Sequence, residues 1–531
     1  MLPGKIATLL ILATFLSVVG ALIVANRYRA AMQRLMKTGG ISPSTATAAP
    51  PAAGPPAATG GPPAPVTPVT PVTPADNRRA RRQLIAGFVI LTLLMALTRT
   101  VQMQVMADGP ITWKTVLTLG AAYSWPVVPV IAVIDRWRRR RLVATLLLWF
   151  VAAVALLTWR VNENVSFAQV LFWMSLDIGL PLVIVTSLCL GGATRAVGPW
   201  LAPVFIVLCW ASQAGIDLLS ELVDRQSPVL YWLTGWLPAS AAIALFALAP
   251  WLVAWWPAKA LGRRLAAAYA RRQVSELFYL FSAVWVIALT GPALGAIASQ
   301  GLGALLDFLP LLWIPLGARV MQAVTGKRSA GRPPTLLVLR VFRQDANVQD
   351  LFDRVIDRWR STGNTVLIAG TDLADRTIDP DDIFTFIDGR LGERFIRSPA
   401  DIARRLADFE WQPDVEGRYR VNECYCHDTT WQQALAALVR ASDVVLMDLR
   451  NFVAQNEGCL HELWVLATTP GLARVVVLMN ERTQLPPAQA AIAEATASAP
   501  AGRFVWLMQH GDEPPVTEEV LTPLFVASDK P

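Results

Sequence analysis

The chain has 531 residues, of which 54% are hydrophobic and only 16% are charged, and its mean hydropathy is +0.43. Soluble globular proteins carry about 25% charged residues, so this composition excludes an ordinary soluble enzyme and indicates a polytopic membrane protein. Residues 1–332 hold 28 Lys and Arg against 10 Asp and Glu, whereas residues 333–531 hold 19 against 29. The net charge of +8 therefore combines a basic membrane region with an acidic soluble region, and no nucleic-acid partner is expected.

Residues 1–41 are expected to form an N-terminal membrane anchor with a short basic tail. The apolar run 6–25 matches the length of a bilayer span and exceeds the core of a signal peptide. Lys5 alone precedes this run, and four basic residues follow it, which places the N-terminus outside the cell: Arg27, Arg29, Arg34 and Lys37. A cleaved signal peptide is the alternative.

Residues 42–77 form a linker rich in Pro, Ala and Thr. A Pro-Val-Thr unit repeats three times within residues 65–73. This composition cannot bury a core and favours an extended polyproline II segment, which is a spacer or a docking strip for a partner.

Residues 78–332 alternate apolar runs with basic connections, which predicts about eight further transmembrane helices. Basic clusters occur at every second connection, near residues 78–82, 136–141, 259–272 and 327–332. The positive-inside rule then places the C-terminal region in the cytoplasm of a multi-pass protein of the plasma or inner membrane, with the lipid bilayer as its partner. The runs expected to span lie near residues 84–106, 116–134, 142–159, 167–190, 199–219, 230–256, 277–299 and 302–320.

Two acidic residues lie in apolar runs next to proline, as at transporter sites with broken helices. Asp177 precedes Pro181, and Asp307 precedes Pro310. A carboxylate within a membrane span is costly and is by default a functional hypothesis, so transport is a third interpretation of the chain.

Residues 333–531 alternate short apolar runs with amphipathic segments. The runs 335–341, 366–369, 444–449, 474–479 and 503–507 are expected to be strands separated by helices. This pattern predicts a doubly wound α/β domain of flavodoxin-like size, with a parallel sheet covered on both faces. Binding sites in such sheets lie at the carboxyl ends of the strands.

The strand near residues 444–447 is followed by the densest polar cluster of this region. The chain runs Asp448-Leu449-Arg450-Asn451 after the strand and then Asn456-Glu457-Gly458-Cys459-Leu460-His461-Glu462 into a helix. The helical stripe Leu460, Leu463, Trp464 and Ala467 is expected to be buried, which leaves Cys459 and Glu462 on a neighbouring face. A solvated Glu462 on the helix surface is the alternative.

This stretch resembles the Toll/interleukin-1 receptor (TIR) domain, in which a strand and loop lead to a helix with a Trp-Cys-x-x-Glu-Leu motif. Here Gly458 replaces the Trp. It is also similar to the Asp-x-Gly-Thr-x-x-Glu motif of nucleoside 2-deoxyribosyltransferases, with Asn456 in place of Asp and Cys459 in place of Thr. The first strand lacks the Ser or Tyr of TIR domains, and residues 372–428 form a longer insert.

Both resemblances imply a flavodoxin-like fold and a glutamate for N-glycosidic bond chemistry, which makes Glu462 the candidate catalytic residue of a NAD nucleosidase-type hydrolase. A fixed carboxylate stabilises or traps the oxocarbenium character at the ribosyl carbon. Asp448 is the candidate for ribose hydroxyls, Arg450 and the helix N-terminus near Gly458 are the candidates for phosphate, and Asn456 and Cys459 complete the nucleotide-binding set. NAD or a related nucleotide is then the substrate, in a signalling or defence role, and no cofactor is required.

The alternative to an enzyme is a membrane sensor or scaffold that recruits partners through the α/β domain, since many TIR domains associate with one another. A metal site at Cys424, Cys426, His427, Cys459 and His461 is disfavoured, because two Cys one residue apart match no common zinc spacing.

Overall fold

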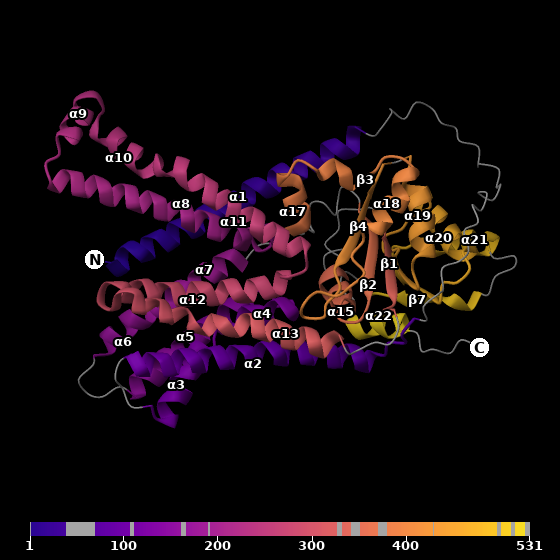
Figure 1. Ribbon diagram of the computed structural model, residues 1–531. Helices are drawn as coiled ribbons and strands as arrows, with labels where there is room; N and C mark the ends of the chain where they lie inside the picture. Colours follow the sequence, from indigo (N-terminus) through magenta and orange to yellow (C-terminus); the bar gives the residue numbers. More distant parts are fainter. Residues whose placement is uncertain are drawn as a thin grey trace. The chain divides into compact units, whose positions relative to one another are not determined.

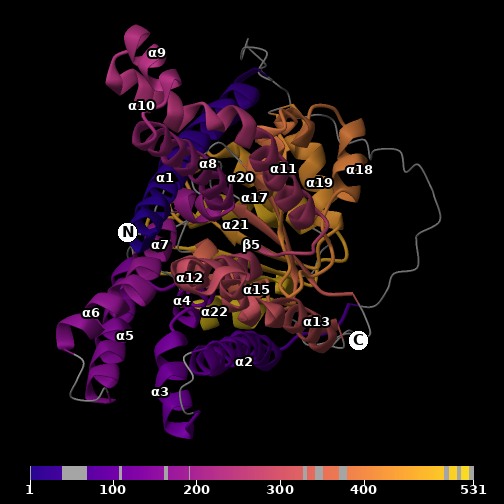
Figure 2. The same cartoon turned by 60° about the vertical axis from the view of Figure 1, so that its left-hand side comes forward.

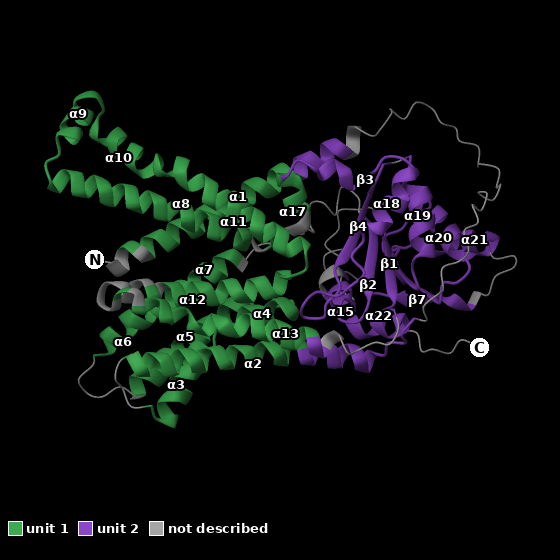
Figure 3. Cartoon of the chain, viewed as in Figure 1, with its two compact units in different colours: residues 1–28, 84–322, 378–387 green, residues 29–83, 323–377, 388–531 purple. Residues whose placement is uncertain are grey.

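The computed structural model describes most of the chain and divides it into two compact units (Figure 1, Figure 3). Unit 1 comprises Met1–Tyr28, Leu84–Gln322 and Ile378–Ile387, and unit 2 comprises Arg29–Gln83, Ala323–Thr377 and Asp388–Pro531. The residues that the structure describes are 2–38, 69–106, 111–160, 166–189, 192–326, 332–340, 351–369, 380–427, 429–495, 501–510 and 516–525.

Unit 1 is built from helices. Two of these helices belong only partly to unit 1, because α1 ends in unit 2 and α2 begins in unit 2. The helices that lie wholly or partly in this unit are α1 (Leu2–Thr38), α2 (Pro74–Met106), α3 (Trp113–Tyr123), α4 (Val127–Ile134), α5 (Arg139–Arg160), α6 (Phe167–Met174), the π-helix η1 (Ser175–Gly179), α7 (Leu180–Cys189), α8 (Gly192–Asp224), α9 (Pro228–Trp236), α10 (Ala239–Leu248), α11 (Pro250–Ala270), α12 (Glu276–Gln300), the 3₁₀ helix η2 (Gly301–Leu312), α13 (Trp313–Gly326) and α17 (Pro380–Ile387).

Seven helices among the described residues are long and apolar enough to cross a membrane. The pair α3 and α4, bent by 47°, becomes an eighth if it counts as one broken span, and α12 holds a shorter apolar stretch, Glu276–Thr290. These segments coincide with most of the predicted runs. The run predicted at 230–256 is different, because Leu237 and Pro238 separate α9 from α10 and the long apolar segment is Ala239–Ala270.

The helices of unit 1 pack through several apolar clusters. One joins α3 to α7 with α12 and includes the fully buried Trp125 and Leu146. A second cluster joins α2, α4 and α12 around Phe88 and Phe281, whose ring centroids are 5.2 Å apart. Elsewhere, α8 lies beside α10 and α11 (Figure 1, Figure 2).

Unit 2 is built on a parallel seven-stranded sheet with the order β3-β4-β2-β1-β5-β6-β7. Its strands are β1 (Thr335–Arg340), β2 (Asn364–Ala369), β3 (Phe395–Ile396), β4 (Val421–Cys426), β5 (Val444–Asp448), β6 (Arg474–Met479) and β7 (Phe504–Met508). From β1 the chain places β2 beside it, then β3 at the edge, then β4 between β2 and β3, and it returns to place β5 on the other side of β1. The strand order therefore reverses between β1 and β5.

Both alternating sets of residues in the central strands are buried, as expected for continuous apolar runs in a parallel sheet. One set, with Leu337 and Val445, packs with α19, α20 and α21 in a single core. The opposite set includes Leu336 and Leu446, which are fully buried. The remaining helical segments of unit 2 are η3 (Phe352–Ile356), α15 (Asp357–Trp359), η4 (Leu391–Arg394), α18 (Ala400–Ala407), α19 (Trp431–Arg440), α20 (Glu457–Thr468), α21 (Leu485–Ala495), η5 (Ala501–Arg503) and α22 (Thr517–Leu524).

The observed boundaries differ from the expected ones in two places. Helix α2 begins at Pro74, inside the stretch 42–77 predicted as linker, and residues 42–68 of that stretch lie outside the described residues. Residues 378–387, expected in the C-terminal domain, group with unit 1. The cause is apolar packing, because Phe384 of α17 contacts the rings of Trp200 and Tyr269.

Candidate functional site

The predicted site lies where the strand order reverses. Asp448 is the last residue of β5, and its register partner is Arg340, the last residue of β1. Both side chains are buried, at 5% and 3% exposure. Ligands of open parallel sheets bind at the carboxyl ends of the strands at such a reversal, so the polar residues of this edge are in the position that favours binding.

Asp448 and Arg450 form a buried, two-pronged ion pair at this edge. Arg450 Nε donates to Asp448 Oδ1 at 2.8 Å, and Arg450 Nη2 donates to Oδ2. The backbone N–H of Arg450 also donates to Asp448 Oδ1 at 3.1 Å. These residues were predicted to have separate ligand-binding roles, whereas the structure joins them to each other.

Glu462 lies on α20 and is 3% exposed, which excludes the alternative of a solvated surface side chain. Burial raises the pKa of Glu462 to about 8, although the charge of Arg340 opposes this shift. Among the described residues, no hydrogen-bond partner reaches its buried Oε2 atom. A carboxyl group in this state is protonated at neutral pH and can donate a hydrogen bond.

The same helix buries Cys459, which belongs to the apolar core of the sheet. Burial, with a smaller contribution from Glu462, raises the pKa of the Cys459 thiol, so this cysteine is not an activated nucleophile. The predicted buried stripe of α20 is correct at Leu463 and Ala467 and wrong at Trp464, which is 43% exposed. Compared with the predicted stripe, the buried face of α20 is rotated around the helix axis, so that it includes Cys459 and Glu462.

Residues at the start of α20 are less enclosed. Asn456 is the residue before the helix, and its Oδ1 accepts a hydrogen bond from the backbone N–H of Val453 at 3.1 Å. Gly458 is exposed in the first turn, and a Cβ atom there would lie 3.8 Å from the Trp431 ring. The first backbone N–H groups of this helix are the part of the predicted phosphate site that the structure leaves accessible.

A side-chain bridge fixes the loop between β5 and α20 to the end of β6. Asn451 has a φ of +61°, and its backbone N–H donates to Asn480 Oδ1 at 2.9 Å. Asn480 Nδ2 in turn donates to Asn451 Oδ1 at 3.1 Å. Asparagine tolerates this left-handed conformation better than most residues, so the pair holds the loop in a defined shape.

The edge therefore combines four buried ionisable side chains from β1, β5, the following loop and α20. Three of them were predicted as site residues, and Arg340 was not. The signal was present, because an arginine ends an otherwise apolar strand. The register of parallel strands then sets it beside the carboxylate that ends the neighbouring strand.

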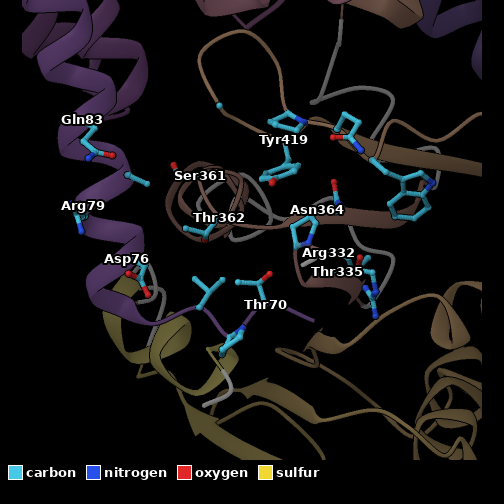
Figure 4. Close-up of a pocket in the computed structure, with 18 of the residues that line it drawn as sticks. Thr70, Asp76, Arg79, Gln83, Arg332, Thr335, Ser361, Thr362, Asn364 and Tyr419 are labelled. Atoms are coloured by element: carbon cyan, nitrogen blue, oxygen red, sulfur yellow. The ribbon is translucent and has the colours of Figure 1, made fainter. Parts of the chain in front are cut away.

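A separate cavity of about 980 Å³ lies at the opposite, amino end of the sheet (Figure 4). Thr335 and Asn364, the first residues of β1 and β2, line it, together with Tyr419. None of the predicted site residues lines this cavity. Its position at the amino ends of the strands distinguishes it from the site predicted at the carboxyl ends.

The described cysteines and histidines do not gather into a metal centre. Cys424 and Cys426 have their sulfur atoms 3.7 Å apart on β4. Over the described part of the chain, no group of three or more His, Cys, Asp or Glu side chains is arranged to hold a metal ion.

A scan of protein-family models finds no match to this chain, and a search of curated proteins finds no relative.

Proposed function

We propose that the chain is an integral membrane protein whose cytoplasmic unit is a doubly wound, TIR-like domain that binds a nucleotide and cleaves its N-glycosidic bond. Membrane insertion is supported by the seven apolar helices of spanning length. The nucleotide chemistry is supported above all by Glu462, a buried carboxyl group with an unpartnered oxygen beside the strand-order reversal.

In the proposed reaction Glu462 faces the ribosyl carbon of NAD. The bond from this carbon to the nicotinamide nitrogen breaks, nicotinamide leaves as a neutral base with the bond electrons, and water supplies the new hydroxyl group and releases one proton. The anionic form of Glu462 stabilises the positive charge that develops on the ribose. The cationic nicotinamide ring favours this anionic form when the substrate binds.

The pKa of Glu462 gives the proposal a pH signature. Because burial raises this pKa to about 8, the free protein holds the reactive anion in only a minor fraction of molecules at pH 7. The value of kcat/KM reports groups of the free enzyme, so it is expected to rise with pH up to an inflection near pH 8.

The test uses the full chain in lipid nanodiscs, incubated with NAD and with a panel of nucleosides, and detects released base by chromatography. Glu462→Gln is expected to lose base release by a factor of at least about 100, since it keeps the shape and removes the anion. Glu457→Gln on the exposed face of the same helix is the matched control and is expected to keep full activity. Equal background rates in all three proteins would refute the hydrolase.

The second candidate is a sensor or scaffold without catalysis. The observation that favours it is the Asp448–Arg450 ion pair, because these two side chains bind each other at the place expected to hold ribose and phosphate. Self-association of the nanodisc-embedded chain in sedimentation, with no shift of the unfolding temperature by NAD, would favour this function.

A further inference from the structure

A second group of charged side chains lies among the apolar helices of unit 1. Arg99 on α2 donates a short hydrogen bond to Asp307 on η2, and both residues are buried. The two charges neutralise each other within this pair. An ion pair of this kind is stable inside a membrane region only because the partners are bonded directly.

Gln102 extends this pair. It lies one helical turn after Arg99 and is 8% exposed, and its Nε2 donates to Asp307 Oδ1 at 2.7 Å. Its Oε1 atom is buried and has no hydrogen-bond partner among the described residues. A buried amide oxygen without a donor costs free energy, so the cluster offers an unused acceptor that a hydrogen-bond donor would satisfy.

Asp177 supplies a second carboxylate to the same group. It lies on the π-helix η1, and Tyr123 Oη of α3 donates to its Oδ2 at 3.3 Å. Asp177 interacts electrostatically with Arg99, which attracts it, and with Asp307, which repels it. Among the described residues, the charged and titratable groups that act on Asp177 are therefore Arg99, Tyr123 and Asp307.

The charges of this cluster do not balance. It contains two carboxylates, Asp177 and Asp307, and one guanidinium, Arg99, which is already bonded to Asp307. The phenol of Tyr123 donates a hydrogen bond and brings no charge. An uncompensated carboxylate among apolar helices in a membrane is energetically costly, so it takes up a positive charge instead.

We propose that Asp177 is an intramembrane proton-binding site, with Arg99–Asp307 as a fixed neutral pair beside it. The carboxylate takes one proton from the aqueous phase and returns it, and no other bond changes. Asp177 is partly exposed, whereas Asp307 is buried. The partial exposure of Asp177 leaves room for its proton to exchange. Its place on a π-helix agrees with this role, because π-bulges within helices occur frequently at functional sites.

A second observation separates this site from a simple acidic cluster. The unpartnered Oε1 of Gln102 is an acceptor within the same group, where a protonated carboxyl or a water that carries the proton would be bound. The cluster joins the spans of α2, of α3 with α4, of α6 with α7, and of η2 with α13. A group that gains and loses charge at the meeting point of four spans is suited to proton-coupled transport or to sensing the proton gradient.

This inference rests on the membrane insertion in the proposed function and not on nucleotide cleavage. The test is infrared spectroscopy of the full chain in lipid nanodiscs at pH 7, which distinguishes the carbonyl band of a protonated carboxylic acid from the bands of a carboxylate. Every protein compared carries Glu462→Gln, because Glu462 is itself protonated at this pH. This background protein is expected to show the acid band, and adding Asp177→Asn is expected to remove it. Asp217→Asn is the matched control, since Asp217 is exposed and paired with Lys5 at 2.7 Å.

A third variant tests the role of the neighbouring pair. In Asp307→Asn the guanidinium of Arg99 loses its bonded carboxylate and becomes the counter-ion of Asp177. The acid band of Asp177 is then expected to disappear although the residue is still present. A structural role for Asp177 alone would not produce this loss, and size-exclusion chromatography of each variant verifies that it is folded.

Three outcomes would overturn the proposal: no acid band in the Glu462→Gln background, a band that survives when Asp177→Asn is added to it, or carboxylate bands that shift with added Na⁺ while no acid band exists. The last would assign the site to a metal cation. Resistance of the chain to extraction from membranes by alkaline carbonate tests insertion separately. The base-release assay tests the nucleotide chemistry, so failure of one proposal is distinguishable from failure of the other.

Discussion

Arg340 and Asp448 end neighbouring parallel strands in register and are both buried. A guanidinium and a carboxylate thus meet the same edge of the sheet from β1 and β5, and Arg450 bonds Asp448 from the following loop. Charged groups held below the surface have little freedom to respond to substitution. The free energy of unfolding is therefore expected to be sensitive to each member of this set.

Asp448→Asn is expected to lower the free energy of unfolding of unit 2 by about 3 to 5 kcal/mol, because it leaves the Arg450 guanidinium buried without its anion. The measurement is denaturant unfolding of the full chain, followed by hydrogen exchange of peptides from β1 and β5. Asp388→Asn is the control, because the Asp388–Arg390 pair is exposed and such pairs contribute about 1 kcal/mol or less. Equal effects of the two substitutions would show that the buried pair is not a structural element.

Glu462 is expected to make unit 2 less stable as the pH rises. Its pKa is about 8 in the folded chain, whereas a glutamate in an unfolded chain has a pKa of about 4.5, so the folded state binds the extra proton between these values. The stabilising contribution of the proton is complete below about pH 4.5 and is lost as the pH rises through 8, a change on the order of 5 kcal/mol.

Hydrogen exchange of the β5 and α20 peptides, compared with Glu462→Gln at each pH, measures this loss. The variant has no titrating group at this position, so the difference between the two proteins is expected to grow from pH 5 to pH 8. Glu457→Gln is expected to follow the wild type. A difference that does not change with pH would contradict a buried, protonated Glu462.

Asn451 provides a test of the loop that follows β5. Asn451→Ala is expected to lower the free energy of unfolding by about 1 to 3 kcal/mol, because it combines the left-handed φ of +61° with loss of the hydrogen bond that Asn480 Nδ2 donates to the Asn451 side chain. Asn451→Gly accepts this φ freely and is expected to cost less than the alanine variant. Denaturant unfolding gives both values, and a more stable alanine variant would contradict the described backbone conformation.

The expected topology is tested with two matched cysteine substitutions in exposed helix connections. Gln226→Cys lies between α8 and α9 on the expected outer side, and Gln273→Cys lies between α11 and α12 on the expected cytoplasmic side. A membrane-impermeant maleimide applied to intact cells is expected to label the first position only. Labelling of both positions after permeabilisation, read by peptide mass spectrometry, is the control. The reverse pattern would invert the orientation derived from the basic clusters.

The sequence predicts the helices and strands of this fold better than it predicts which side chains the packing of those elements buries. Run length alone located most apolar helices, and the alternation of apolar strands with helices predicted the parallel sheet. The burial of Glu462 could not be predicted, because its position on the helical wheel lies at the margin of the apolar stripe. Tertiary packing determines which residues at this margin are buried, and it leaves Trp464 exposed.

Arg340 illustrates a second limit. Its importance depends on the pairing of β1 with β5, which are separated by more than 100 residues in the chain. No local pattern reveals such a register. The cavity at the amino end of the sheet was not predicted for the same reason, because residues from five segments that are distant in the chain line it.

Helix α2 is a continuous rod of 33 residues, about 50 Å long at 1.5 Å per residue. Near its start, Asn77 Nδ2 donates to the backbone oxygen of Arg358 at 2.8 Å and to Thr362 Oγ1 at 3.0 Å, just before β2. An axial displacement of this rod by one residue is half the length of these bonds. Such a displacement must break them or pull the turn that leads into β2, which makes Asn77 a mechanical coupling between the sheet and α2, a helix long and apolar enough to cross a membrane.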